Sequence, residues 1–288
     1  MKIFVPADSS AKSVGSDSVA RILGAATPQA HMVRNGSRGM YWLEPLVEVE
    51  TDQGRVAYGP IYPADANSLA VALNGNGEHP KFLGVTSELP WIREQTRLTF
   101  ERVGIIDPLD PVDFAAHGGL AGLQQALVKT SESIIDEVMA SGLRGRGGAG
   151  FPAAIKWRTV AQAQSDIKYI CINADEGDSG TFADRVLMEG DPFTLIEGMA
   201  ISAIATGATH GYIYIRSEYP DAIAVMNAAL DIAREHTWIG PAILGSHHPF
   251  EITVRVGAGS YVCGEETAML ESLEGKRGMV RPKPPIPA

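Results

Sequence analysis

The second half of the chain alternates between short apolar runs and longer segments with helical periodicity. Apolar runs of strand length occur at residues 167–172, 212–215 and 252–256. Helical periodicity occurs at residues 195–207, 221–234 and 265–273. Thr194 and Glu197 have the spacing of a capping box at the first of these helices, and Gly275 would end the last. Strands that alternate with helices pair in parallel, so these residues predict a Rossmann-like three-layer α/β domain.

The first hundred residues predict a separate, smaller α/β unit. Its expected elements are a strand at 2–5, a helix at 16–25, a strand at 30–33, two strands at 40–50 and 55–58 around a turn, and a helix at 64–73. This is the element order of thioredoxin. Prolines mark residues 80–118 as connection, and residues 120–141 predict one amphipathic helix that ends at Gly142. The predicted domains are a thioredoxin-like domain at 1–105, a linker at 106–119 and the larger α/β domain at 120–288.

Composition excludes several classes of function. A formal net charge of −10 argues against a nucleic-acid surface, which needs clustered lysine and arginine. No apolar run approaches the ~18–20 residues that span a bilayer, and the first residues lack a secretory signal, so we expect a cytoplasmic protein without membrane insertion. Cys171 and Cys263 are too few for a zinc or iron–sulfur site, which takes about four ligands. We therefore expect no metal in this chain and two small, buried, apolar cysteines.

Residues 142–152 form the first motif, Gly-Leu-Arg-Gly-Arg-Gly-Gly-Ala-Gly-Phe-Pro, with Lys156 just beyond it. Its glycines allow the backbone to bend closely around a ligand. Consecutive backbone N–H groups, together with Arg146 and Lys156, could hold a phosphate group. A flexible connector is the alternative interpretation, and the spacing matches neither a Rossmann fingerprint nor a Walker loop.

Two acidic motifs follow predicted strands. Residues 173–181, Asn-Ala-Asp-Glu-Gly-Asp-Ser-Gly-Thr, come after the first strand, and residues 257–267, Gly-Ala-Gly-Ser-Tyr-Val-Cys-Gly-Glu-Glu-Thr, come after the third. Open α/β sheets bind ligands beyond the carboxyl ends of their strands, where both motifs are expected. The first motif could bind Mg²⁺ with phosphate, contact a flavin and a ribose, or form a solvated turn. Glu265 and Glu266 could instead favour the start of the next helix.

Taken together, these motifs resemble the flavoprotein subunit of NADH dehydrogenases, the 51-kDa-type subunit of respiratory complex I and its relatives. The resemblance extends from about residue 143 to residue 288. It includes the three motifs, Tyr-Ile-Arg at 214–216, Glu-Gly-Lys at 274–276 and Lys-Pro-Pro at 283–285, all in order. The relatives include diaphorase subunits of NAD-reducing hydrogenases and of soluble NAD-dependent formate dehydrogenases.

The resemblance implies FMN and NAD(H) as cofactors and assigns site residues. FMN would be held by Gly145, Arg146, Gly147, Gly148, Lys156, Asn173, Asp175, Glu176, Tyr261, Gly264, Glu265 and Glu266. NAD(H) would contact Phe151, Asp178, Glu266 and Lys283. Hydride would pass between nicotinamide and flavin, so no catalytic acid or base is assigned to the chain, and electrons would pass singly to or from iron–sulfur clusters.

Three features depart from the family pattern. Asp178-Ser179 stands where many relatives have Glu-Pro, which keeps the acid but shortens it by a methylene. Ile286 stands where an aromatic residue commonly follows the Lys-Pro-Pro run. The family continues with a segment that completes the flavin site, a ubiquitin-like module and a helical domain that holds a 4Fe–4S cluster. We therefore expect this chain to be a fragment.

The N-terminal region helps to choose among these relatives. A cysteine-free thioredoxin-like domain, with Ser9 and Ser10 where cluster ligands would stand, resembles the beta subunit of cytosolic, molybdenum-containing formate dehydrogenase. That resemblance implies two partners, a catalytic alpha subunit with molybdenum and iron–sulfur clusters and a small gamma subunit with a 2Fe–2S cluster. The alternatives are the diaphorase subunit of an NAD-reducing hydrogenase or of a complex I-like enzyme, and a non-catalytic docking subunit.

Overall fold

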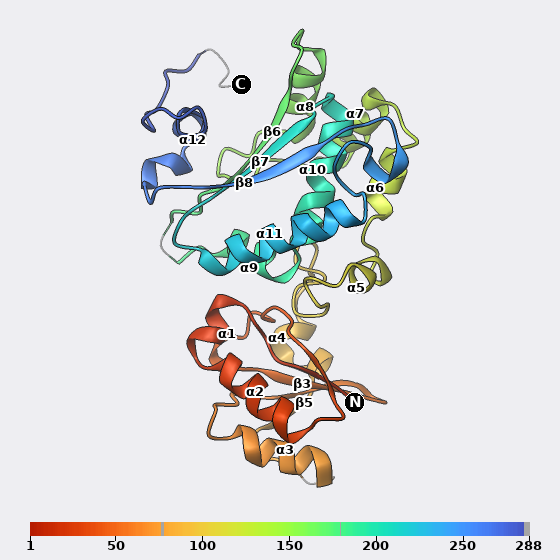
Figure 1. The fold of residues 1–288 in the computed structure, drawn as a ribbon, viewed down its shortest axis with the longest axis vertical. Helices are drawn as coiled ribbons and strands as arrows, with labels where there is room; N and C mark the ends of the chain where they lie inside the picture. Colours follow the sequence, from red (N-terminus) through yellow and green to blue (C-terminus); the bar gives the residue numbers. More distant parts are fainter. Residues whose placement is uncertain (76–77, 179, 285–288) are drawn as a thin grey trace. The chain divides into compact units, whose positions relative to one another are not determined.

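The computed structural model describes residues 1–75, 78–178 and 180–284, and the chain divides into two compact units (Figure 1). The first unit comprises Met1–His117 and Val186–Pro192, and the second comprises Gly118–Arg185 and Phe193–Ala288. Helix α9 (Ala183–Gly190) therefore begins in the second unit and ends in the first.

The first unit is built on a five-stranded sheet in the order β2-β1-β3-β4-β5. Its strands are β1 (Lys2–Phe4), β2 (His31–Val33), β3 (Val47–Thr51), β4 (Gly54–Tyr58) and β5 (Phe82–Val85). β1 and β2 pair in parallel, and the other pairs are antiparallel. The hairpin between β3 and β4 turns at residues 51–54, as predicted. The expected order of strand, helix, strand, hairpin and helix is present, and β5 adds an edge strand.

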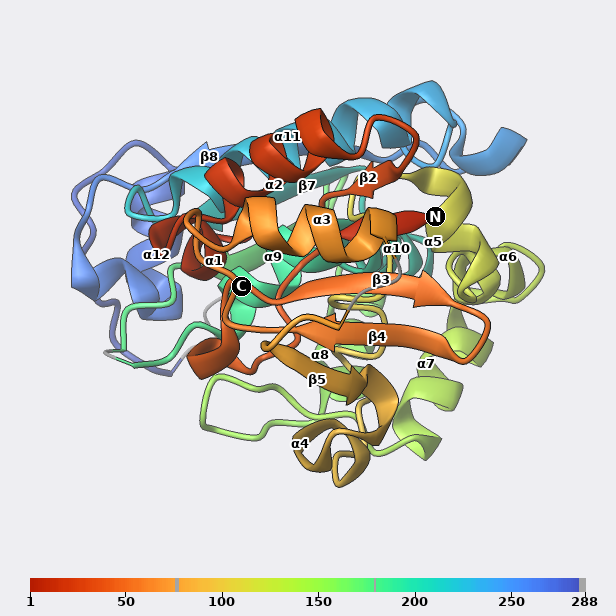
Figure 2. The same cartoon turned by 90° about the horizontal axis from the view of Figure 1, so that it is seen from below.

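Two helices cover one face of this sheet. α2 (Ser16–Ala26) and α3 (Ala66–Gly75) lie side by side across it in Figure 2, after the short helix α1 (Ser9–Ser13). Fully buried Leu23 and Leu69 of the two long helices lie in one apolar cluster with side chains of the strands. Because apolar burial is the main favourable term in folding, this layer holds the unit together.

Residues 80–118 are not only connection, in contrast to the prediction from their prolines. They contain β5 and two short helices, α4 (Pro90–Arg93) and α5 (Pro111–Ala116). Proline is favoured in the first turn of a helix, where its missing N–H needs no partner. The Asp110 side chain completes the start of α5 by accepting hydrogen bonds from two backbone N–H groups. These prolines therefore mark helix starts as well as loops.

The first unit buries charged side chains beside its sheet. Glu48 of β3 is 1% exposed and accepts hydrogen bonds from Arg38 at 2.9 and 3.1 Å. Glu44 is also buried and accepts from Ser37 Oγ at 2.7 Å and from a backbone N–H at 2.9 Å. Burial, reinforced by the charge of Asp8, raises the pKa of Glu44 from 4.5 to about 7. The folded unit therefore holds a proton on Glu44 in mildly acidic solution.

We predict that the first unit loses stability as the pH rises through the raised pKa of Glu44. The unfolded chain releases this proton near pH 4.5 and the folded chain near 7, so the stabilisation is complete only below the lower value. The loss across this window is up to about 3 kcal/mol. Urea unfolding at a series of pH values should show a flatter dependence for Glu44→Gln. Glu50→Gln, at an exposed position, is the matched control, and equal pH dependence in the two variants would contradict the prediction.

The second unit contains the predicted parallel sheet. Its strands are β6 (Tyr169–Ala174), β7 (His210–Ile215) and β8 (Glu251–Val256), in that order across the sheet. Both pairs are parallel and in register along their whole length. The Rossmann-like α/β prediction is confirmed, and each strand begins and ends within two residues of the expected position.

Helices α10 (Pro192–Thr206) and α11 (Pro220–Glu235) lie along one face of this sheet (Figure 1). A Cβ added at Gly211 of β7 would lie 2.8 Å from Met199 of α10, so the helix approaches the strand closely. Ile213 on the same face of β7 is fully buried. This face therefore forms the apolar core of the unit.

Helix α12 (Glu266–Leu273) packs on the opposite face, which gives the unit its three layers. Tyr214 of β7 lies in one buried cluster with Cys263 and Met269. Cys171 of β6 packs against the same cluster, and both cysteines are free thiols. The two cysteines thus help to join the sheet to α12.

The helix predicted at residues 120–141 is interrupted, and the prediction of a single helix was wrong. The chain forms α6 (Ala121–Ala126) and α7 (Ser131–Ala140) instead. Thr130 accounts for the break, because its side chain accepts a hydrogen bond from the Ser133 backbone N–H at 3.2 Å and so caps α7. The apolar stripe runs past this cap and did not reveal it.

Glu197 does not cap the helix that contains it. α10 begins at Pro192, so Thr194 lies inside the helix rather than at its N-cap, and the expected capping box was wrong. The Glu197 carboxylate instead accepts from the backbone N–H groups of Leu120 and Leu123, each at 3.0 Å. It thereby satisfies free amides at the start of α6, a different helix.

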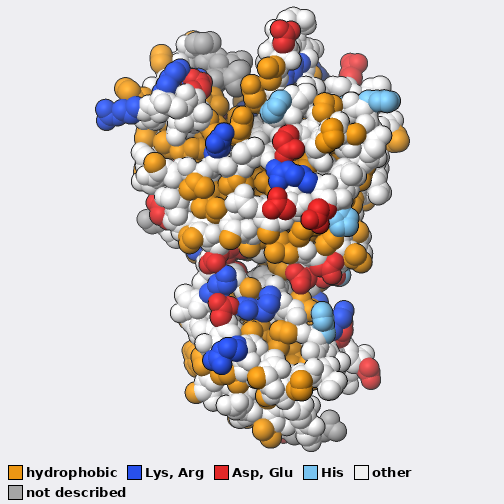
Figure 3. Space-filling model, viewed as in Figure 1, with side chains coloured by type: hydrophobic (Ala, Val, Ile, Leu, Met, Phe, Trp, Pro, Cys, Tyr) orange, Lys and Arg blue, Asp and Glu red, His pale blue; other side chains and the backbone are white. Residues whose placement is uncertain are grey.

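On the face drawn in Figure 3, basic and acidic side chains are interspersed in each unit rather than gathered by sign. The described part of this face therefore has no extended region of positive or negative potential that would attract a ligand of one charge. Within the described residues, no helix has the length and apolar character needed to cross a membrane.

Candidate functional site

Three loops leave the sheet of the second unit at the same edge. Because the strands end in register, the residues that follow them start from neighbouring positions. The acidic motif at 173–181 follows β6 and the motif at 257–267 follows β8, where a ligand-binding edge is expected. Ser179 and Ile286, two of the departures from the family pattern, lie outside the described residues.

The glycine motif forms a closed loop that leads into a helix. An antiparallel bridge joins Arg144 to Pro152 at its base, and the Gly145 N–H donates to the Phe151 carbonyl at 2.9 Å. Helix α8 (Ala153–Gln162) begins directly after the loop, and its N-cap residue, Pro152, provides no side-chain cap. Free amides at a helix N-terminus favour an anion, so this end of α8 suits a phosphate group.

The glycine loop borders open space. A Cβ added at Gly147 or Gly148 would meet no atom within 4 Å. Gly148 has a φ of 95°, which side chains of L-residues rarely adopt. Arg146 is exposed, and so is Phe151, at 45% of its surface. A ligand can therefore approach this backbone without displacing a side chain.

Two lysines contact the acidic pair of the motif after β8, and one of them, Lys156, also lies near the glycine loop. Lys156 of α8 lies 3.9 Å from the Glu266 carboxylate and 5.9 Å from the centre of the Phe151 ring. Lys283 lies 2.5 Å from the Glu266 carboxylate and 3.0 Å from that of Glu265. These five predicted residues, distant in sequence, form one charged cluster.

Glu265 has a structural role in this cluster. Its carboxylate caps α12 by accepting from the backbone N–H groups of Thr267 and Ala268 at 2.9 and 3.0 Å. Partial burial opposes ionisation, but hydrogen bonds from Thr267, Ala268 and Lys283 hold the pKa of Glu265 at about 2. Helix capping, one of the two interpretations of this acidic pair, thus applies to Glu265, while both lysines contact Glu266.

The motif after β6 is joined to the motif after β8. Asn173 Nδ2 donates to the Gly264 carbonyl at 2.8 Å, and the Tyr261 hydroxyl donates to Asp178 Oδ1 at 2.9 Å. A Cβ added at Gly177 would lie 2.8 Å from the Tyr261 ring, so the absence of a side chain there allows the contact. Tyr261 remains 72% exposed and lies over this junction.

Asp175 and Glu176 are both buried but differ in their partners. Asp175 Oδ2 has no hydrogen-bond partner among the described residues, and burial raises the pKa of this carboxyl. The Glu176 carboxylate accepts from the backbone N–H groups of Asp184 and Arg185 at the start of α9, and from the Tyr219 hydroxyl. Glu176 is therefore engaged by the fold, whereas Asp175 keeps an acceptor for a ligand.

Arg216, Tyr219 and Asp184 belong to this site but were not among the predicted residues. Arg216 follows β7 and donates to the Glu176 carbonyl and, at 3.0 Å, to Glu218. Burial and the charge of Glu176 raise the pKa of Asp184 to about 6. The Tyr-Ile-Arg run was a signal for Arg216, but no spacing in the sequence pointed to Tyr219 or Asp184.

These motifs place the chain in a known family. The model of the Nuo51 FMN-binding domain matches residues 138–288, and the chain belongs to this 51-kDa flavoprotein family. The match includes all three motifs. The resemblance stated from sequence is therefore confirmed, and so is FMN as the cofactor of the matched domain.

Two curated relatives are components of oxidoreductases. The NADP-reducing hydrogenase subunit HndC of Solidesulfovibrio fructosivorans is 48% identical over 68% of this chain and 40% of its own length. The mitochondrial NADH dehydrogenase [ubiquinone] flavoprotein 1 of Dictyostelium discoideum is 45% identical over 60% of this chain and 36% of its own length. The chain thus spans no more than about two fifths of the length of these curated relatives.

A solved structure is similar to nearly the whole chain. The crystal structure of an NAD⁺-reducing [NiFe]-hydrogenase in the air-oxidized state has a TM-score of 0.52 and 25% identity, and it covers 99% of this chain and 47% of that chain. The similarity therefore includes the first unit, most of which lies outside the residues matched by the family model.

The described residues fit FMN in three respects. The buried Asp175 Oδ2 is an acceptor without a protein partner and can accept from a flavin N–H or a ribityl hydroxyl. The open glycine loop and the uncapped N-terminus of α8 suit a phosphate, with Arg146 and Lys156 as cations. Phe151 and Tyr261 offer exposed aromatic surfaces at the same edge.

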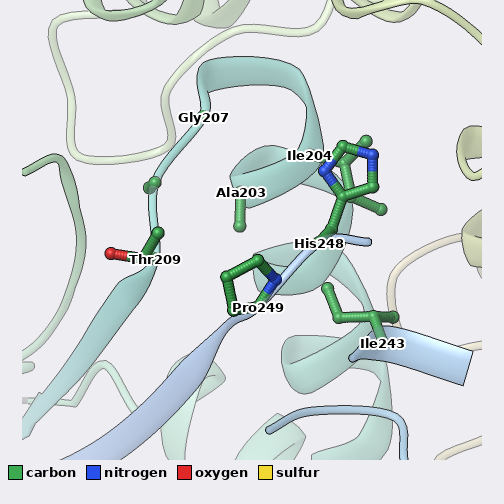
Figure 4. Close-up of a pocket in the computed structure, with 8 residues that line it drawn as sticks. Ala203, Ile204, Gly207, Thr209, Ile243, His248 and Pro249 are labelled. Carbon is green, nitrogen blue, oxygen red and sulfur yellow. The ribbon is translucent and has the colours of Figure 1, made fainter. Parts of the chain in front are cut away.

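A separate cavity lies at the opposite edge of the sheet. It has a volume of about 50 Å³, and its lining includes Ala203, Ile204, Thr209, Ile243, His248 and Pro249 (Figure 4). Thr209 and Pro249 precede β7 and β8, so this cavity lies near the amino ends of the strands. It is not part of the site at the carboxyl ends.

We predict that Gly177→Ala weakens FMN binding by about tenfold or more. The added methyl would lie 2.8 Å from the Tyr261 ring, and relieving such a clash costs about 1–3 kcal/mol, where 1.4 kcal/mol is tenfold. Titration of the apoprotein with FMN, followed by flavin fluorescence, measures the change. Gly198→Ala in α10 adds the same methyl where no atom lies within 4 Å, and it should bind FMN like the wild type. Equal affinities of the two variants would count against a flavin site beside Tyr261.

Proposed function

We propose that the chain is the FMN-bearing diaphorase part of a multi-subunit oxidoreductase and exchanges hydride between NAD(H) and FMN. One observation carries this proposal: the three sequence motifs converge at one edge of the sheet. Lys156, just beyond the glycine loop, contacts Glu266 in the motif after β8, and Asn173 of the motif after β6 donates to the Gly264 carbonyl of the same motif. Membership of an FMN-binding family supports it. A non-catalytic docking subunit would have no use for the unpartnered buried acceptor on Asp175.

Each motif has a role on the FMN side. The glycine loop at 145–148 and the start of α8 would bind the phosphate, with Arg146 and Lys156 supplying positive charge. Asn173 and Asp175 would face the flavin ring and the ribityl chain, and Tyr261 would close the site. Bound FMN would supply the chemistry that converts a two-electron hydride transfer into single-electron steps. The residues of the chain orient both cofactors and fix the charges around them.

The nicotinamide nucleotide would lie on the exposed side of the same site. Phe151 offers a stacking surface beside Lys156. Lys283, which now contacts Glu265 and Glu266, would turn to the nucleotide phosphates. Asp178 and Glu266 would accept hydrogen bonds from ribose hydroxyls. Their negative charge would disfavour the extra 2′-phosphate of NADP, so NAD(H) is the proposed nucleotide.

We further propose a cytoplasmic, molybdenum-containing formate dehydrogenase as the complex to which this subunit belongs. The sequence of the first unit has no cysteine, and Ser9 and Ser10 begin α1 where cluster ligands would stand. Ser9 Oγ instead donates to Glu189 at 2.6 Å. The partners would be the molybdenum- and iron–sulfur-containing alpha subunit and the 2Fe–2S gamma subunit. A 4Fe–4S cluster would be held by sequence beyond position 288.

The diaphorase subunit of an NAD-reducing hydrogenase is the second candidate. The structural similarity to the NAD⁺-reducing [NiFe]-hydrogenase covers 99% of this chain, including its first unit. In that case the electron donor would be hydrogen and the partners would be hydrogenase subunits, while the flavin site would have the same role.

We predict that the natively purified protein contains stoichiometric FMN and reduces ferricyanide with NADH. Acid-released flavin is measured by absorbance, and ferricyanide reduction is measured by its bleaching. Residues 1–288 alone should hold FMN weakly, because the family adds a segment that completes the site. Absence of both flavin and activity from the native protein would overturn the diaphorase proposal and favour a docking subunit.

We also predict which donor reduces NAD⁺ through this subunit. The complex, purified by an affinity tag on this chain, should reduce NAD⁺ with formate and not with hydrogen, and should contain molybdenum. NAD⁺ reduction by hydrogen together with nickel would reject the formate dehydrogenase and support the second candidate. Ferricyanide reduction by NADH serves as the control that the flavin subunit is active in the same preparation.

A further inference from the structure

Arg216 extends from the end of β7 to the acidic loop after β6. Its guanidinium donates to the Glu176 backbone carbonyl and, at 3.0 Å, to Glu218, and it lies 5.1 Å from the centre of the Tyr219 ring. Arg216 Nε is buried and has no hydrogen-bond partner among the described residues. These contacts hold a positive charge directly beside the turn that carries Asp175.

Burial and two neighbouring charges act in opposite directions on the pKa of Asp175. Burial raises its pKa, the charge of Arg216 lowers it, and the charge of Glu218 raises it again. Tyr214 of β7 is a further titratable group that interacts with Asp175. Of the two charged residues that act on Asp175 from the loop after β7, Arg216 favours ionisation of its carboxyl and Glu218 opposes it.

The Glu176 carboxylate, unlike that of Asp175, is already occupied by hydrogen bonds from the protein. Its carboxylate already accepts two backbone N–H groups at the start of α9 and the Tyr219 hydroxyl. Arg216 binds the carbonyl of this residue and not its carboxylate. The guanidinium therefore fixes the backbone of the turn, while its charge acts on Asp175, whose Oδ2 has no partner among the described residues.

We propose that Arg216 is a positioning residue of the flavin site, which fixes the turn after β6 through the Glu176 carbonyl and places a positive charge beside Asp175, the residue whose carboxylate would accept hydrogen bonds from the bound flavin. This inference rests on the proposed function. An ionised carboxylate accepts stronger hydrogen bonds from flavin N–H and ribityl O–H groups than a protonated one. FMN affinity should consequently decrease as the pH falls through the pKa of Asp175.

The test is the pH profile of FMN affinity in the natively purified protein after its flavin is removed. Fluorescence titrations from about pH 3.5 to 8, which include the ordinary range of an aspartate, would compare the wild type with Arg216→Gln, Arg216→Lys, Glu218→Gln and Asp175→Asn. The FMN phosphate itself titrates near pH ~6, but equally in every variant, so the comparison between variants isolates Asp175. Arg234→Gln is the matched control, because Arg234 forms its ion pairs with Asp231 and Glu251 in α11 and β8.

The pH at which FMN affinity is lost should shift in opposite directions in Arg216→Gln and Glu218→Gln. Arg216→Gln should move the acid-side loss of affinity upward by about one pH unit or more, and Arg216→Lys should restore most of it. Glu218→Gln should move it downward by a smaller amount, because the exposed like charge is removed. Asp175→Asn should lack this part of the profile, and Arg234→Gln should match the wild type.

A uniform loss of affinity at every pH in Arg216→Gln, without a shift, would overturn the inference and leave Arg216 with a purely structural role. If Arg216→Gln fails to fold by circular dichroism, Glu218→Gln decides, since Glu218 is exposed; an unshifted profile there would also overturn the inference. Failure of the wild type to bind FMN at any pH would instead overturn the proposed function.

Discussion

The common end of three parallel strands is the constraint on which the site depends. β6, β7 and β8 pair in register through their last residues, so the loops after them must leave the sheet side by side. Asn173 can therefore bond the Gly264 carbonyl, 91 residues later in the chain, and Arg216 can reach Glu176, 40 residues earlier. Neither contact needs a long connecting loop, because the register of the sheet has already brought the segments together.

The basic side chains at this edge of the sheet already lie at the site, next to acidic or backbone acceptors. Lys156 and Lys283 contact Glu266, and Arg216 lies beside the turn of Asp175. Such prearranged charges cost little reorganisation when a charged group binds, which is the main electrostatic advantage of a protein site over water. An acidic edge can thus accept the phosphates of FMN and NAD(H), because its lysines are already present and exchange one anion for another.

The sheet of the second unit could be predicted from sequence, whereas several contacts of the site could not. Buried parallel strands leave continuous apolar runs, and the glycine and acidic motifs keep their order in the chain. Thr130 interrupts an apolar stripe by a local cap that the stripe does not reveal. Glu197 accepts from the backbone N–H of Leu120, the N-cap of α6, which lies 77 residues before it, and Arg216 binds a backbone carbonyl. The Glu197 and Arg216 contacts join segments that are distant in sequence, so they depend on tertiary packing and leave no periodic pattern.

Helix α9 is bound at its first turn to the acidic turn after β6. Its first amides donate to the Glu176 carboxylate in the second unit, and its last turn, in the first unit, places Glu189 where Ser9 donates to it at 2.6 and 2.8 Å. A helix is cooperative, so loss of the interactions at one end weakens the whole element. The residues that hold Asp175 in place therefore include Glu176 and its helix.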